Sequence, residues 1–398
     1  MPGKGRILVL CEGPVSEPKS GSETVAHHQA AGLARAGWEV CALTRRPGRQ
    51  GPPVVQETAG FVEVSVPAPP TRPGAFFRAL ARELPRACDR LVKDGFSAVV
   101  AHQPLSYLLL RAAGRLSGVP LMYVFHAPWH QEYLVSRPWL PALAPGALAR
   151  RRLESTALAR AKRVVALSAY TAGKAHRIHG LPRQWAEVIP GGADCGRFSP
   201  PQKTDAPDGA RVRLFTLRNL EPRMGLEALL YAMARLEADQ PGRFSLLLGG
   251  SGPEQQRLAA LRKKLSLERA VDLAGFIPGK DLPGHYQRAH FFVLPSADLE
   301  GFGLVTAESL ACGTPVLGTP VGATPEILSG LDPGLVFADP SPEAMAQGIR
   351  AMADRAAADP GGYHALRAAC RALARKKYTW ERHVAAFSRV VEEEALGG

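Results

Sequence analysis

The sequence predicts an α/β protein made of two doubly wound domains in tandem. Its 398 residues exceed what one hydrophobic core usually supports, and 46% of them are hydrophobic, which is enough for two cores. Short apolar runs alternate along the chain with stretches of helical periodicity, a pattern typical of parallel sheets covered by helices. An aperiodic segment rich in Pro, Asp, Lys and Gly, at 196–209, divides this series in two.

The first series predicts a parallel sheet with helices on its faces. Its strand-like runs are RILVLC (6–11), WEVCALT, SAVVAH, PLMYVFH, RVVALS and AEVIPGG, which ends at 192. Helical periodicity lies between them, at 23–36, 105–116 and 148–161.

The second series repeats the alternation after the aperiodic segment. Its strands are VRLFTL (212–217), RFSLLLGG, AVDLAGF, HFFVLPS and TPVLGT, and its helices are 226–237, 254–265, 282–288 and 304–311. Open sheets bind ligands at the carboxyl ends of their strands, so we expect the chemistry in a central cleft that the two Rossmann-like domains face.

The charge and the cysteine content limit the classes of binding partner and the cellular compartment that we expect. The net charge of +13 leaves three partners open, namely nucleic acid, an anionic membrane surface and a phosphorylated small molecule. No helix-turn-helix, zinc-finger or RNP-like pattern is present, so we expect no nucleic acid. The six cysteines are scattered without metal-ligand spacing, which favours a reduced cytoplasm and no metal. No apolar run approaches the roughly 18 residues that span a bilayer.

The run from 135 to 163 mixes Trp, Leu and Arg and leaves peripheral contact with an anionic membrane open. The favoured alternative is a helix packed on its sheet with a solvated Arg face, because Pro138, Pro141 and Pro145 interrupt the apolar face.

The stretch SADLEGFGLVTAESLACGTPV, 296–316, is the most informative of the chain. We expect a loop that exposes Glu300, followed by a Gly301-Phe302-Gly303 turn and a helix that bears Glu308. Backbone amides at a glycine-opened helix N-terminus suit a diphosphate, and carboxylates accept sugar hydroxyls. The alternative is a solvated loop acid and a carboxylate that complements the helix dipole.

Two arginines flank the turn in LFTLRNLEPRMG, 214–225. Arg218 and Arg223 could bind phosphate oxygens through their guanidinium groups. The alternative is a pair of surface arginines.

The N-terminal half offers a small-residue loop, SGSE at 20–23, and a histidine, His126, at the end of a predicted strand. The loop is not a Gly-x-Gly-x-x-Gly pattern, so a dinucleotide site is disfavoured. A lone histidine is more often structural, but the predicted topology places His126 at the rim of the cleft.

With these motifs the chain resembles glycosyltransferase family 4, the retaining enzymes of GT-B fold. The resemblance covers nearly the whole chain. It is carried by EGFGLVTAE followed by ACGTPVLGTPVGATPEIL, and by AHQP, VFH, RVVALSAYT, VIPGGADCGRF, LLLGGSGPE and YTWERHVAAF.

The resemblance implies a role for each candidate. Glu300 would hold hydroxyls of the donor sugar, and Glu308 the ribose. The Gly301 turn would present the amides of Phe302, Gly303 and Leu304 to the sugar and diphosphate. Further contacts would come from Ile277 to the base, and from His126 and Gly21 to the sugar and phosphate.

One departure from the family pattern concerns the phosphate site. The family has Arg and Lys at the positions of Asn219 and Met224. Arg218 and Arg223 each lie one residue earlier, and we expect them to neutralise the diphosphate in their place.

The resemblance implies a hexosyltransferase that uses a nucleoside-diphosphate sugar and acts on an acceptor hydroxyl of a glycan, a lipid-linked compound or a small molecule. The alternatives are a sugar-nucleotide epimerase, a glycan phosphorylase or a non-enzymatic binding module. We expect an acceptor-binding domain at 1–195, a linker at 196–210, a donor-binding domain at 211–375 and a last helix, 376–398, that returns to the first domain. We expect no cofactor and no essential divalent ion.

Overall fold

The computed structural model describes residues 4–47, 51–68, 73–91, 95–137, 139–203, 205–207 and 211–396. Pro138 and parts of the segments 67–77 and 196–210 lie outside the described residues. The chain divides into two compact units, each described by itself. Unit 1 comprises Met1–Leu134, Trp139–Pro190 and Glu381–Gly398, and unit 2 comprises Val135–Pro138 and Gly191–Trp380.

Unit 1 contains an eight-stranded sheet of order β3-β4-β2-β1-β5-β6-β7-β8. The strands are β1 (Arg6–Leu10), β2 (Glu39–Pro47), β3 (Val54–Thr58), β4 (Phe61–Ala68), β5 (Ala98–Ala101), β6 (Leu121–Phe125), β7 (Ala161–Ala166) and β8 (Ala186–Val188). Neighbouring strands pair in parallel except at the edge, where β3 is antiparallel to β4. The doubly wound sheet is therefore confirmed, but the β3–β4 hairpin was not predicted.

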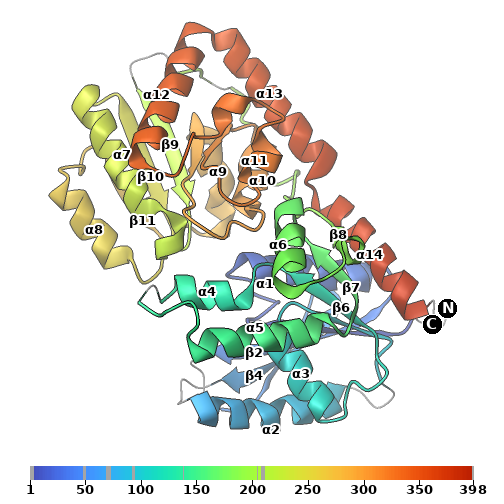
Figure 1. The fold of residues 1–398 in the computed structure, drawn as a ribbon. Helices are drawn as coiled ribbons and strands as arrows, with labels where there is room; N and C mark the ends of the chain where they lie inside the picture. The colour runs from blue at the N-terminus through green and yellow to red at the C-terminus, as the bar shows by residue number, and fades with distance from the viewer. Residues whose placement is uncertain are drawn as a thin grey trace. The chain divides into compact units, whose positions relative to one another are not determined.

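Helices cover both faces of this sheet (Figure 1). Leu8 and Leu10 of β1 face a core shared with α2 (Pro73–Leu91), α3 (Pro104–Ala112) and α5 (Pro145–Leu158). Ile7 and Val9 face the other core, with α1 (Gly21–Arg35) and the C-terminal α14 (Trp380–Leu396). The alternation follows from the two-residue period of a strand that is buried on both faces.

Unit 1 also contains two shorter α-helices, α4 (Trp129–Val135) and α6 (Ala169–His179). The helix predicted at 148–161 in fact begins at Pro145. A proline is favoured in the first turn of a helix, where its missing N–H has no partner to lose.

Unit 2 contains a five-stranded parallel sheet of order β11-β10-β9-β12-β13. Its strands are β9 (Val212–Leu217), β10 (Phe244–Gly249), β11 (Val271–Gly275), β12 (Phe291–Leu294) and β13 (Val316–Gly318). Its helices are α7 (Leu226–Asp239), α8 (Gln255–Lys264), α9 (Leu282–Arg288), α10 (Leu304–Ala311), α11 (Thr324–Leu328), α12 (Pro342–Ala358) and α13 (Pro360–Lys377). Helix α7 packs beside α12, and α10 beside α13 (Figure 1).

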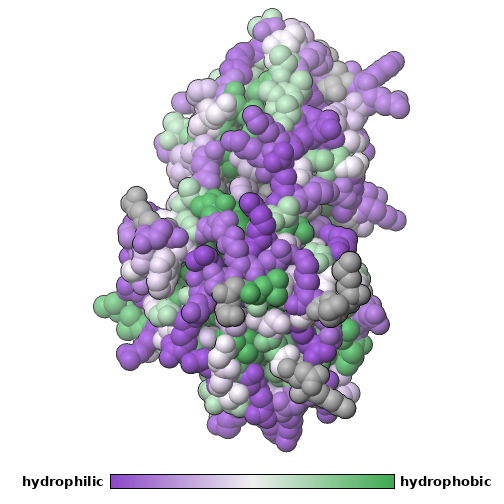
Figure 2. Space-filling view, turned by 90° about the vertical axis from the view of Figure 1, so that its right-hand side faces the viewer, coloured by the Kyte–Doolittle hydropathy of each residue, from purple (hydrophilic) through white to green (hydrophobic). Residues whose placement is uncertain are grey.

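The surface seen in Figure 2 is largely hydrophilic, with small separate hydrophobic areas. Within the ranges that the structure describes, no helix combines the length and apolar character that crossing a membrane requires. The cytoplasmic location and the membrane contact stay predictions.

Candidate functional site

Glu300 lies in the loop between β12 and α10 and is only 6% exposed. Its Oε2 accepts hydrogen bonds from Ser296 Oγ at 2.6 Å and from Arg218 Nη2 at 2.5 Å. The prediction that the loop exposes Glu300 is therefore wrong. The carboxylate turns inward because a buried cation is available to pair with it.

The surroundings of Glu300 keep it ionised. Burial alone would raise the pKa of this carboxyl, but the Arg218 charge and the hydrogen bonds from Ser296 and Arg218 outweigh burial and lower the pKa below its ordinary value. The charge of Arg223 acts in the same direction. A fixed carboxylate of this kind can accept hydrogen bonds from sugar hydroxyls.

The loop that carries Glu300 is held by hydrogen bonds to its backbone carbonyls. The Ala323 amide donates to the Glu300 carbonyl at 3.0 Å, and Thr319 Oγ1 donates to the Ser296 carbonyl at 2.6 Å. Leu299 adopts a φ of 54°, a left-handed conformation that is uncommon for a leucine. Strain of this kind persists only where the surrounding structure determines the conformation.

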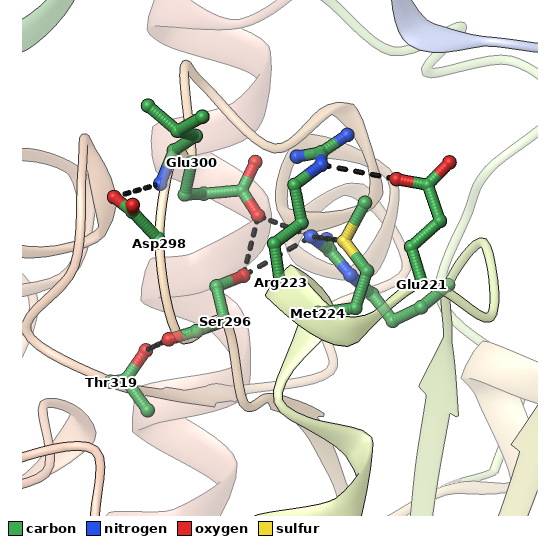
Figure 3. Close-up of polar contacts among 9 residues, drawn as sticks. Glu221, Arg223, Met224, Ser296, Asp298, Glu300 and Thr319 are labelled. Atoms are coloured by element: carbon green, nitrogen blue, oxygen red, sulfur yellow. Dashed lines mark hydrogen bonds and ion pairs between the residues drawn. The ribbon is translucent and has the colours of Figure 1, made fainter. Parts of the chain in front are cut away.

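Arg218 and Arg223 flank the turn after β9, which contains the short 3-10 helix Pro222–Met224. The Arg218 side chain is buried, and its Nη2 also lies 3.1 Å from Ser296 Oγ and 2.7 Å from Met224 Sδ. The view that Arg218 is a surface arginine is therefore wrong. Figure 3 shows the guanidinium of Arg223 between the carboxylates of Glu300 and Glu221, and its Nε donates to Glu221 at 3.1 Å.

The positions that depart from the family pattern lie in different environments. Met224 is buried against the Arg218 guanidinium, whereas Asn219 is exposed. The Ala297 amide donates to the Arg223 carbonyl at 2.9 Å, so the turn after β9 is joined directly to the Glu300 loop.

The turn Gly301-Phe302-Gly303 leads into α10 as predicted. Gly303 is the N-cap, with a φ of 77° and no side chain that caps the helix. Leu304 and Val305 are the first residues of α10, so their amides have no helical carbonyl one turn earlier to bind. Phe302 is buried and packs edge-on against Tyr378, with ring centroids 5.5 Å apart.

Glu308 lies one turn inside α10. Its Oε2 accepts a hydrogen bond from the Tyr286 hydroxyl at 2.8 Å. Burial raises the pKa of Glu308 to about 7, although the Tyr286 hydrogen bond and the Arg197 charge act in the opposite direction. Ile277, the predicted contact of the base, is buried in the loop after β11.

Gly21 lies in unit 1 and is the first residue of α1, so the stretch SGSE is not a loop as predicted. Ser20 is the N-cap, its Oγ accepts from the Glu23 amide, and Glu23 Oε2 accepts from the Ser20 amide at 3.1 Å. The spacing Ser-x-x-Glu is the signature of a capping box, and this signal in the sequence was missed.

His126, also in unit 1, directly follows β6. Its Nε2 lies 2.9 Å from His102 Nδ1, and the two rings stack. Burial lowers the pKa of His102 well below its ordinary value and that of His126 to about 4, so both rings are neutral at pH 7. His102 was missed as a site residue, although AHQP places it at the end of a strand.

The structure thus gathers the candidates into two groups. Glu300, Arg218 and Arg223 meet at one point of unit 2, beside the turn that opens α10. Gly21 and His126 belong to unit 1. In the described parts of the chain, no group of three or more His, Cys, Asp or Glu side chains is arranged to hold a metal ion.

Nearly the whole chain has a fold similar to that of solved structures. Sucrose-phosphate synthase from Thermosynechococcus elongatus superimposes with a TM-score of 0.83 at 21% identity, covering 99% of this chain and 100% of that one. The Anabaena protein HepE in complex with UDP-glucose has a TM-score of 0.73 at 17% identity, covering 98% and 100%. These similarities confirm the GT-B fold.

Both halves of the sequence match glycosyltransferase family models. Residues 19–197 match the family described as Glycosyltransferase Family 4, and residues 201–376 match Glycosyl transferases group 1. A D-inositol 3-phosphate glycosyltransferase from Geodermatophilus obscurus is 30% identical over 392 residues, which cover 91% of this chain and 83% of that protein. The chain therefore belongs to the family 4 glycosyltransferases.

Proposed function

We propose that the chain transfers a hexosyl residue from a nucleoside-diphosphate sugar to an acceptor hydroxyl, with retention of the anomeric configuration. The observation that carries this proposal is the buried, ionised Glu300 at the turn that opens α10. A fixed carboxylate beside uncovered helix amides can bind sugar hydroxyls and a diphosphate at once.

Each part of the donor has a candidate partner in unit 2. Glu300 binds hydroxyls of the sugar, and the amides of Phe302, Gly303 and Leu304 contact the sugar and the diphosphate. Glu308 accepts from the ribose hydroxyls, and the backbone near Ile277 meets the base. In unit 1, His126 and Gly21 contact the sugar and the phosphate.

The residues contribute positioning and charge stabilisation. We assign neutralisation of the departing diphosphate to Arg223 and the α10 N-terminus, while Arg218 acts chiefly by holding Glu300 ionised. Front-face attack, in which the leaving phosphate helps to deprotonate the acceptor, fits these roles. No divalent ion is required in this scheme, so a chelator should leave the rate unchanged.

UDP-glucose is the first donor to test, because HepE was solved with it. Melting temperatures measured with UDP, GDP, ADP and dTDP sugars rank the donors, since a ligand that binds only the native state raises the melting temperature. Release of the nucleoside diphosphate in the presence of acceptor then measures transfer.

Substitution of Glu300 tests the site itself. Glu300→Gln keeps the shape of the side chain but removes its charge, so we expect kcat to fall by about 100-fold or more, as when a preorganised electrostatic partner is removed. Glu343→Gln, at an exposed carboxylate of the same unit, is the matched control. A Glu300→Gln enzyme that is folded and fully active would refute the assignment.

The same assay separates the alternatives. An epimerase would isomerise the free sugar nucleotide without acceptor, and a phosphorylase would require inorganic phosphate. A binding module would be stabilised by the nucleotide without turnover.

A further inference from the structure

Tyr286 lies on α9 and is fully buried, and its hydroxyl donates a hydrogen bond to Glu308 Oε2 at 2.8 Å. Helix α9 packs beside α10, which carries Glu308 (Figure 1). Glu308 itself is half-buried, and its Oε1 accepts no hydrogen bond from the described residues. The protein therefore holds one oxygen of this carboxylate, and the other can accept from a ligand.

The ring of Tyr286 is fixed in an aromatic cluster. It packs edge-on against Phe198 and Phe215, with ring centroids 5.9 and 5.2 Å away, and tilted against Phe292 at 5.4 Å. Thr314 Oγ1 donates to the Tyr286 carbonyl at 2.8 Å. The neighbouring rings are all phenylalanines, so the packing of the cluster does not require a hydroxyl. The hydroxyl of Tyr286 serves the contact with the carboxylate on α10 instead.

Arg197 also acts on the Glu308 carboxylate. Its guanidinium lies over the Phe198 ring, 4.8 Å from the centroid, and donates to the Gly279 carbonyl. Its positive charge lowers the pKa of Glu308. Gly279 lies two residues after Ile277, so Arg197 joins the candidate contact of the ribose to the candidate contact of the base.

We propose that Tyr286 is a positioning residue for the donor. Its hydroxyl holds Glu308 Oε2 so that Oε1 accepts from the ribose hydroxyls, and it thereby sets how strongly the chain distinguishes a ribonucleotide from its deoxy analogues. This inference rests on the proposed function, which assigns the ribose to Glu308. A hydrogen bond to an ionised acceptor is stronger than a neutral one, and an acceptor that is fixed in advance loses less conformational entropy on binding.

Nucleotides that differ by one hydroxyl test the proposal. Calorimetry gives the Kd of whichever of UDP, ADP and GDP stabilises the chain most, and of its 2′-deoxy and 3′-deoxy forms. We expect the wild type to bind the ribonucleotide at least about 10-fold more tightly than one of the deoxy forms, the size expected for a hydrogen bond to a charged group. Tyr286→Phe should reduce this ratio by about 3- to 10-fold and leave the Kd of that deoxy form within about twofold.

Tyr363→Phe is the matched control. Tyr363 is also buried in unit 2, and its hydroxyl donates to the His290 carbonyl at 2.9 Å, so this variant loses a buried hydroxyl away from Glu308. Its ratio should equal that of the wild type.

A double variant shows whether Tyr286 acts through Glu308. In a Glu308→Gln background, Tyr286→Phe should change the ratio by less than about twofold, because the hydroxyl acts only through the carboxylate. A Tyr286→Phe chain with the full wild-type ratio, or one that binds the ribonucleotide and the deoxy forms equally more weakly, would overturn the inference.

The pH dependence of the same ratio is a second readout. Burial raises the pKa of Glu308 to about 7, and the Tyr286 hydrogen bond opposes this rise. The ratio needs the ionised carboxylate, so it should fall as the pH is lowered through about 7 in the wild type, and already at higher pH in Tyr286→Phe.

The other groups that act on Glu308 keep their charge over this range. Arg197 stays protonated, and burial raises the pKa of the Cys312 thiol to about 12 and that of Tyr286 well above its ordinary value. The phosphate of the nucleotide titrates equally in the ribo and deoxy forms, so it cancels in the ratio. A midpoint that stays in place in Tyr286→Phe, or moves to lower pH, would overturn the inference.

Failure of this inference differs from failure of the proposed function. A chain that binds the nucleotide and transfers sugar, but has the same affinity for the ribo and deoxy forms, contradicts the inference and the assignment of the ribose to Glu308, but not sugar transfer. A chain that binds none of the nucleotides contradicts the proposed function, and the inference with it.

Discussion

Arg218 is buried at 8% exposure, where an unpaired guanidinium would be costly. Glu300 supplies the matching charge, and Ser296 completes the contact with both side chains. Each charge therefore compensates the cost of burying the other. We therefore expect Arg218 to act on the chemistry through the protonation state of the Glu300 carboxylate.

This dependence predicts a pH effect. In Arg218→Leu, burial still raises the pKa of Glu300, and only the Ser296 hydrogen bond and the Arg223 charge remain to oppose it, so the pKa should rise. The acidic limb of the pH–rate profile should then move to higher pH. In the wild type, Glu300 stays ionised at pH values below the ordinary pKa of a glutamate.

The control for this profile is Arg235→Leu, which breaks an exposed ion pair between α7 and α12. Arg218→Lys keeps the charge and should restore much of the wild-type profile. An acidic limb that does not move in a folded Arg218→Leu enzyme would show that Arg218 does not control the protonation of Glu300.

At the scale of elements, the turn between β13 and α11 supports the Glu300 loop. Gly322 has a φ of 68°, and a Cβ on it would lie 1.9 Å from the Glu300 carbonyl oxygen. The neighbouring Ala323 amide donates to that same carbonyl. The close approach of the two backbones requires glycine.

Gly322→Ala should therefore displace the Glu300 loop. We expect a loss of at least about 1–3 kcal/mol in the free energy of unfolding, from the backbone strain alone, together with reduced turnover. Gly330→Ala is the matched control, because a Cβ there meets nothing within 4 Å. Urea unfolding of both variants measures the difference, and equal midpoints would contradict the role of Gly322.

Elements with strong periodicity were predictable from the sequence. The ranges 212–217, 282–288 and 304–311 match β9, α9 and α10 residue for residue, because each lies between clear turn signals. The β3–β4 hairpin was missed, since VVQET carries little apolar alternation and lies exposed at the sheet edge.

The site was predictable in its residue types but not in its contacts. The glycine turn and the two glutamates could be recognised because they lie close together in the sequence. The pairing of Arg218 with Glu300 joins residues 82 positions apart, and no local pattern encodes it. The burial of Glu300 depends on this pairing, so its predicted exposure was wrong for the same reason.

On the scale of the whole molecule, the proposed function assigns most of the donor contacts to unit 2. In that proposal the diphosphate binds chiefly in unit 2, at the N-terminus of α10. The net charge of +13 favours anions in general, so it does not specify where a nucleotide binds. Hydrogen exchange can locate the nucleotide, because it reports each segment separately.

With UDP at about a hundredfold excess over its Kd, the native state should gain about 2.7 kcal/mol, and the whole chain should exchange more slowly. Above this general effect, protection should concentrate at 302–305, where amides at the start of α10 acquire phosphate partners. Uridine lacks the diphosphate and, at the same relative excess, should leave this segment without the added protection. Protection by UDP that is concentrated in unit 1, or that uridine reproduces at 302–305, would exclude the α10 N-terminus as the diphosphate site.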